Sequence, residues 1–163
     1  MKKKIGKKGL ALIMKVGYNK YAVRFAIEDY TPTPEEHRPA GKQYVKYADI
    51  EFNHKPILAE IREAIEAAHN ADITDAIVNG YTHDGIAVAL TLENQSNFAA
   101  ILAVGTFPMT IKIGSDYATF ETKTAFKTFY TGCREHIDAQ LAAGRSVKEA
   151  YDWQAYADAL AQV

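Results

Sequence analysis

Apolar and polar residues alternate along two stretches of the first third of the chain. In residues 20–28 the larger apolar side chains fall at every second position, at Tyr21, Val23, Phe25 and Ile27. A second alternation covers residues 44–52, and a period of two is typical of a strand that buries one face. Residues 17–19 include a glycine and separate the first stretch from an apolar run at 10–16, which predicts a hairpin. We therefore expect a small three-stranded β module at the N-terminus.

Residues 29–42 lie between the second and third predicted strands and interrupt the alternation. They combine charged residues with Pro32, Pro34, Pro39 and Gly41. Proline lacks a backbone N–H and glycine adopts conformations that other residues avoid, so this composition is typical of a loop. We expect residues 29–42 to form an exposed loop, the most mobile part of the chain and a candidate contact surface.

The hydrophobic period changes to that of a helix after Pro56. Apolar residues then recur at helical spacing, at Ile57, Ile61, Ile65, Ala68 and Ile73. Asn79 and Gly80 supply a helix stop. A second helix is predicted at residues 92–104, where Thr91 can cap the first turn.

The longest apolar stripe occupies residues 123–143 and predicts a third helix, which Gly144 is expected to end. Ser146 and Glu149 then form a capping-box pattern, which predicts that a last helical segment opens there. Its apolar residues are Tyr151, Trp153, Tyr156 and Leu160.

Two hairpins are predicted between these helices. Residues 81–83 and 86–90 flank Asp84 and Gly85, a dipeptide favoured in tight turns because both residues tolerate a positive φ. The second hairpin pairs residues 109–113 with 117–121. The fold class expected from this order is α+β, with antiparallel β-hairpins packed against three to four helices and preceded by the three-stranded module. We expect a β module with a basic tail at residues 1–53 and an α+β domain at 54–163.

The charge of the chain is unevenly distributed. Residues 1–52 carry eleven Lys and Arg against six Asp and Glu, whereas residues 53–163 carry eight against fourteen. Five of the lysines fall within the first eight residues, which predicts a solvated N-terminal tail. A single cysteine, Cys133, excludes an intrachain disulfide. The apolar run that follows the first lysines is too short for a secretory signal, and no stretch approaches the length of a membrane span, so no membrane partner is expected.

The sequence offers little catalytic chemistry. It contains neither a dinucleotide-binding glycine pattern nor a P-loop, and its five histidines show no metal-binding spacing. Cys133 and His136 lie three residues apart on a predicted helix, but Cys133 falls within the apolar stripe, where cysteine normally packs as a small hydrophobe. We expect no enzyme activity, no catalytic residue, no metal site and no cofactor.

The candidate binding residues are basic and aromatic side chains that alternate in the N-terminal module: Lys20, Arg24, Tyr44, Lys46 and Tyr47. Basic strands with stacking aromatics hold nucleotides or single-stranded nucleic acid in some proteins. Strand propensity explains the same composition, because tyrosine packs well in sheets and lysine protects their edges. Arg24 shares a strand face with Lys20, whereas Tyr21 points to the opposite face, so one pocket would need aromatics from the third strand or another subunit.

Between residues 56 and 156, about 100 of the 163 residues follow a recognisable order. Its parts are LENQSNF at 92–98, Phe107 and Pro108 before a strand, Thr119 to Glu121, Phe129 with Tyr130, and Asp152, Trp153 and Tyr156. This order resembles an uncharacterised domain family of bacteriophages and prophages, especially those of Bacteroidetes. The chain departs from the family pattern in a shorter link before Phe107 and in its lysine-rich start.

The resemblance implies a non-enzymatic phage protein that is tail-associated, as a structural component or in tail-fibre assembly. Its expected partner is a phage protein or a second copy of itself, in a homo-oligomer. The alternative is a phage counter-defence protein that sequesters a host immune nucleotide; binding of nucleic acid is the weakest of the three. The expected location is the host cytoplasm during infection, with the virion as a second place.

Overall fold

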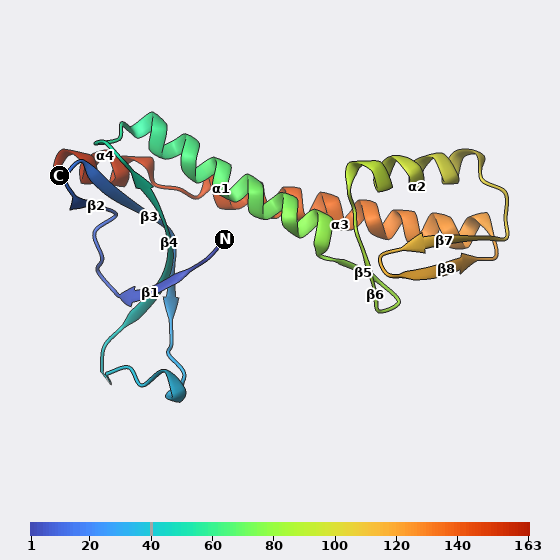
Figure 1. Ribbon diagram of the computed structural model, residues 1–163, viewed down its shortest axis with the longest axis horizontal. Helices are drawn as coiled ribbons and strands as arrows, with labels where there is room; N and C mark the ends of the chain where they lie inside the picture. The colour runs from blue at the N-terminus through green and yellow to red at the C-terminus, as the bar shows by residue number, and fades with distance from the viewer. Residues whose placement is uncertain (40) are drawn as a thin grey trace. The chain divides into compact units, whose positions relative to one another are not determined.

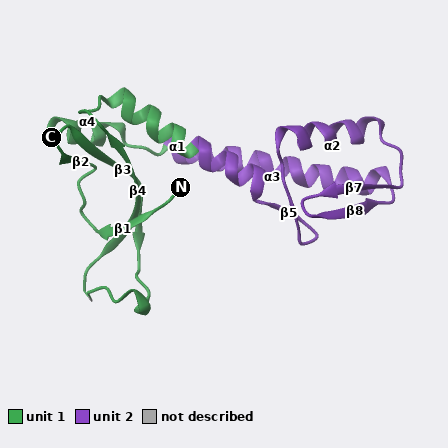
Figure 2. Cartoon of the chain, in the orientation of Figure 1, with its two compact units in different colours: residues 1–69, 150–163 green, residues 70–149 purple. Residues whose placement is uncertain are grey.

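The computed structural model describes residues 1–39 and 41–163, so the predicted loop at 29–42 is described except for residue 40. The chain forms two compact units (Figures 1 and 2). Unit 1 contains residues 1–69 and 150–163, and unit 2 contains residues 70–149. This division differs from the expected boundary after residue 53. The first part of the helix after Pro56 and the C-terminal helix both fall in the same unit as the N-terminal sheet.

Unit 1 is built on a sheet of four antiparallel strands in the order β1-β4-β3-β2. Their bounds are Lys4–Lys7 for β1, Ile13–Gly17 for β2, Lys20–Tyr30 for β3 and Tyr44–Phe52 for β4. The three predicted strands are therefore present as β2, β3 and β4. A fourth strand, β1, is added at the edge formed by β4.

β1 corrects the expectation of a solvated N-terminal tail. Lys4 pairs with Tyr47 and Lys7 with Tyr44, and the Lys8 N–H donates to the carbonyl of Gln43 at 2.9 Å. Three ion pairs tie the lysines to the sheet, Lys3 to Glu28 at 2.9 Å, Lys4 to Asp49 at 2.7 Å and Lys8 to Asp29 at 2.9 Å. The lysines therefore line a paired strand and are not a free tail.

The chain turns back along the sheet after β1 and passes close to Gly6. A Cβ at Gly6 would lie 2.6 Å from Leu10 Cδ1 and 3.0 Å from Tyr47 Cε1, so a larger residue here would require the Leu10 side chain to move. Val45, which lies on the same face of the sheet as Gly6, is only 4% exposed.

The opposite face of the sheet packs against helices. These are α4 (Trp153–Ala161) and the first part of α1 (Leu58–Asn79). The buried residues of this core are Ile13, Val23, Phe25, Ala48, Ile61, Ile65 and Tyr156. In Figure 1, α4 lies near one end of β3 and β4, and the loop between these two strands lies at their other end.

A β-bulge in β3 marks where the helix-covered part of the strand ends. Ala26 has a φ of 50°, and the register shifts between Phe25 and Glu28. The Ala26 N–H donates to Tyr151 Oη at 3.1 Å, and Tyr156 Oη donates to the Arg24 carbonyl at 2.8 Å. Burial raises the pKa of both tyrosines, which keeps the hydroxyl groups neutral. The backbone groups freed by the bulge are thus satisfied by the C-terminal segment.

Unit 2 combines two β-hairpins with helices around one aromatic core. Its elements are the remainder of α1, β5 (Tyr81–His83), β6 (Ile86–Val88), α2 (Leu92–Val104), β7 (Met109–Ile113), β8 (Asp116–Phe120) and α3 (Lys123–Glu149). Phe98, Phe126 and Phe129 pack at the centre, with ring centroids 5.1 Å apart for Phe98 and Phe129. Asp84 and Gly85 both have positive φ, at 49° and 81°, as the predicted turn requires. Both predicted hairpins are confirmed.

The end of α3 differs from the prediction. Gly144 does not stop the helix, which continues to Glu149, and the Ser146 hydroxyl donates to the Ala142 carbonyl within it. A Cβ at Gly144 would overlap the side chain of Ile73 on α1, so the glycine is required by close helix packing. The last helix instead begins after Asp152, whose carboxylate accepts from the Ala155 N–H at 3.1 Å.

The fold class is α+β, as expected, and residues 1–39 and 41–163 form four α-helices and antiparallel sheets. Among the described residues, no helix combines the length and the apolar composition needed to cross a membrane.

Candidate functional site

The strongest candidate site lies at the end of the unit 1 sheet beyond the bulge. We call it the distal site and define it as the end of β1, the last residues of β3, the first residues of β4 and the loop between β3 and β4. The loop contains a short 3-10 turn, η1 (Pro34–Glu36).

Glu36 organises the first part of this loop. Its carboxylate accepts from the Tyr30 hydroxyl at 2.8 Å and from the Thr33 N–H at 3.0 Å. The hydrogen bond from Tyr30 holds the pKa of the Glu36 carboxyl below its usual range. The predicted loop therefore includes a hydrogen-bonded turn that is fixed to the end of β3.

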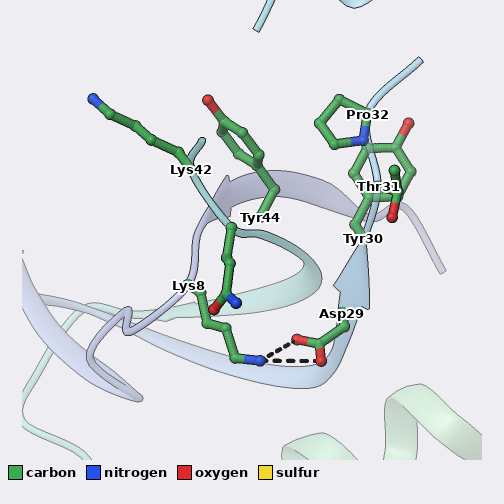
Figure 3. Close-up of a pocket in the computed structure, with 8 residues that line it drawn as sticks. Lys8, Asp29, Tyr30, Thr31, Pro32, Lys42 and Tyr44 are labelled. Carbon is green, nitrogen blue, oxygen red and sulfur yellow. Dashed lines mark hydrogen bonds and ion pairs between the residues drawn. The ribbon is translucent and has the colours of Figure 1, made fainter. Parts of the chain in front are cut away.

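A pocket of about 300 Å³ opens beside this turn (Figure 3). Tyr30 and Pro32 lie on one side of the pocket, and Lys42 and Tyr44 lie on the other. Lys8 and Asp29 form an ion pair near its base, drawn dashed in Figure 3. Since Tyr30 and Tyr44 are paired in register across β3 and β4, the sheet itself sets the spacing of the two walls.

Lys42 also lines two neighbouring hollows. One, of about 310 Å³, includes His37 and Arg38, and the other, of about 500 Å³, includes Lys7 and Lys8. All three hollows are open to solvent rather than enclosed. The distal site is thus an extended, indented surface with Lys42 at its centre.

Basic residues outnumber acidic ones in the distal site, with Lys7, Lys8, Arg38, Lys42 and Lys46 against Asp29, Glu35 and Glu36. Lys8 is paired with Asp29, and Glu36 accepts from Tyr30 and Thr33 and also interacts electrostatically with Arg38 and Lys46. Within residues 1–39 and 41–163, no ion pair neutralises Lys7, Arg38 or Lys42. This surface therefore favours an anionic ligand or partner.

The tyrosine rings of this part of the sheet are already occupied by cations of the same chain. Lys46 Nζ lies 3.9 Å from the centroid of the Tyr30 ring, and the Arg38 guanidinium carbon lies 5.4 Å from that of Tyr44. Tyr44 is also only 5% exposed. Cation–π contacts hold these cations in place, so the rings are poor platforms for a stacking base.

The structure separates the five predicted binding residues. Tyr44 and Lys46 belong to the distal site, whereas Lys20 begins β3 at the other end of the sheet. Arg24 and Tyr47 lie together on the opposite sheet face, with the Arg24 guanidinium carbon 5.2 Å from the Tyr47 ring centroid.

Arg24 has a structural role that the sequence did not indicate. It donates to the Ala11 carbonyl at 2.8 Å and contacts Met14 Sδ at 2.7 Å. Arg24 therefore holds the segment between β1 and β2 against the sheet. Its guanidinium is already engaged by these partners, which makes it a poor choice for binding a phosphate.

Three residues of the distal site are not among the predicted binding residues: Lys8, Tyr30 and Lys42. The sequence places Lys8 in a solvated tail, and it includes Tyr30 and Lys42 only as members of the candidate contact loop at residues 29–42. Only the pairing of Tyr30 with Tyr44 and of Lys7 with Tyr44 brings these segments together.

The other residues considered for chemistry in the sequence are buried or hydrogen-bonded to the backbone of this chain. Burial raises the pKa of the Cys133 thiol to about 12, and the ring of His136 is hydrogen-bonded at Nε2 to the Ala76 carbonyl at 2.9 Å. Asn94 and Gln95 donate their side-chain amides to the carbonyls of Ala89 and Leu90, which fixes the start of α2. Over the described residues, no cluster of three or more His, Cys, Asp or Glu is placed to hold a metal ion.

Comparison of the chain with protein-family models, with curated proteins and with solved structures finds no match. The fold and the site define it as an α+β protein with a basic, tyrosine-lined surface at the end of its N-terminal sheet.

Proposed function

We propose that this chain is a non-enzymatic bacteriophage protein that binds a protein partner as a tail-associated structural or assembly component. The proposed partner is a phage protein or a second copy of the chain. It acts in the host cytoplasm during infection, and the virion is a second proposed location. The phage context rests on the residue pattern at positions 56–156.

The distal site is the observation that carries the binding role. Its hollows are open and lie side by side around Lys42, which suits a broad contact more than an enclosed small ligand. Arginine and tyrosine are enriched where interfaces gain most of their binding free energy. Tyr30 lies at this surface, and so does Arg38, which covers the buried ring of Tyr44.

A second candidate function, sequestration of a nucleotide, is favoured by the pocket of about 300 Å³ with Lys8 and Lys42 at its walls. Its weakness is that Lys46 and Arg38 already cover faces of the two tyrosine rings. A base that stacked on either of these faces would have to displace a cation.

Isothermal titration calorimetry against a panel of cyclic and linear nucleotides separates the two functions. We expect no binding at micromolar nucleotide concentrations. A micromolar affinity, worth about 8 kcal/mol, that is lost in Lys42→Glu and kept in Lys20→Glu would establish the nucleotide function instead. Lys20→Glu is the matched control because it reverses an exposed lysine at the other end of the same sheet.

A further inference from the structure

β1 provides a free strand edge next to the distal site. In the order β1-β4-β3-β2, one side of β1 pairs with β4, and its other side pairs with no strand of the described chain. The backbone groups along a free edge can accept a strand from another chain. β2 forms the second edge, but its pairing is irregular between Lys15 and Gly17. β1 pairs in continuous register and is the better template.

The edge strand has a fixed pattern of charge. β1 reads Lys4, Ile5, Gly6 and Lys7, and Lys8 follows at once. Since side chains alternate between the faces of a sheet, Lys4 and Lys7 lie on opposite faces. An added strand would therefore meet one lysine on each face, with Ile5 and Gly6 between them.

The charge pattern of β1 favours some binding partners at its free edge over others. In an antiparallel pair of two β1 strands, Lys4 of each copy would face Lys7 of the other, and like charges placed opposite each other destabilise a sheet. Nucleic acid is disfavoured because the rings of Tyr30 and Tyr44 carry the chain's own cations. An extended acidic polypeptide meets neither obstacle.

We propose that the free edge of β1 binds an extended acidic segment of the partner protein by strand addition. The partner segment carries acidic residues at positions i and i+3, opposite Lys7 and Lys4, with a small residue opposite Gly6 and an apolar one opposite Ile5. Lys7 lines the same hollow as Lys42, so the segment continues from the edge into the distal site. This inference rests on the proposed protein-binding function and specifies the chemistry of the partner.

A synthetic peptide tests the inference directly. The probe contains the core Glu-Thr-Val-Glu, and a matched peptide of the same sequence has N-methyl groups on the backbone nitrogens of Thr and Val. Calorimetry on the full-length chain is expected to show binding of the first peptide and a loss of about tenfold or more for the second, which keeps its charge but cannot form the ladder. Hydrogen exchange of residues 4–7 is expected to slow on binding.

Two charge-reversal variants provide the controls in the chain. Lys7→Glu is expected to weaken peptide binding by about fivefold or more, the scale of one lost surface ion pair. Lys20→Glu is expected to leave it unchanged. Equal affinity for both peptides would overturn strand addition, and so would a short single-stranded oligonucleotide that binds more tightly than the peptide.

The inference and the proposed function fail in different ways. If partner capture is abolished by Lys42→Glu but retained by Lys7→Glu, the distal site is correct and the strand inference is wrong. Absence of peptide binding, combined with self-association of Lys7→Glu, would show that the lysines only protect the edge and would overturn the inference.

Discussion

Arg24 and Gly144 show how a residue's role depends on contacts that the sequence does not display. Arg24 stands among basic and aromatic residues and suggests a ligand, yet its guanidinium is engaged by Ala11, Met14 and Tyr47. Gly144 follows a long apolar stripe and suggests a helix stop, yet it lies within α3 where Ile73 of α1 approaches. In both cases the deciding neighbour is distant in the sequence, at least ten residues away for Arg24 and about 70 for Gly144.

Gly144→Ala tests the close approach of α1 and α3. Helix propensity alone predicts that this change stabilises the chain by about 0.5–1 kcal/mol. We expect the opposite, a loss of about 1–3 kcal/mol, because the new methyl group overlaps Ile73. Denaturant unfolding followed by circular dichroism measures the change. Ser146→Ala, at an exposed position two residues further along α3, is expected to stay within about 0.5 kcal/mol, and a gain in stability for Gly144→Ala would contradict the packing.

Cys133 provides a pH-dependent test of burial. Its side chain is 2% exposed, and burial raises the pKa of its thiol to about 12. A thiol reagent is therefore expected to react slowly with native protein near pH 8 and rapidly after unfolding in denaturant. Since the unfolded thiol ionises near pH 9, its contribution to stability is present below that pH and is lost as the pH rises toward 12. Rapid labelling of the native protein would contradict the buried assignment.

The elements that the sequence predicted best are those whose signals are local. Asp84 and Gly85 define their turn within two residues, and Thr91 caps α2 by accepting from the Asn94 N–H at 3.2 Å. β1 was not predicted because its partner, β4, lies about 40 residues away and because five of residues 2–8 are lysines. The distal site was predicted only in part, through its loop and through Tyr44 and Lys46, because the complete site requires β1, β3 and β4 to be aligned.

Deletion of residues 1–7 tests β1 as a structural element. A solvated tail would contribute nothing, whereas deletion of β1 removes the strand that pairs with β4 beside the buried Val45. We expect the free energy of unfolding to fall by about 2 kcal/mol or more, the scale of exposing one core valine. Thermal unfolding of the deletion is compared with a variant carrying Lys2→Ser and Lys7→Ser, which loses two charges but keeps the strand. Equal melting temperatures for the deletion variant and the intact chain would instead support a solvated N-terminal tail.

The chain divides into two units with different surface character. Unit 1 carries thirteen basic and eleven acidic residues, and unit 2 carries six and nine. Unit 2 has the larger aromatic core and the hairpins with the clearest sequence signals. Unit 1 has the free strand edge and the basic hollows around Lys42. On the proposed function, we expect the partner to bind unit 1, and we expect changes at the distal site to alter binding without altering the fold.

Site-specific photo-cross-linking tests that assignment most directly. A photoreactive amino acid is placed at position 42 in one variant and at position 20 in another, and both are expressed in host cells that carry the proposed phage. We predict that position 42 yields a discrete cross-link to one phage protein, or to a second copy of this chain, and that position 20 yields none. Cross-links from position 20 alone, or the same products from both positions, would contradict the distal site as the binding surface.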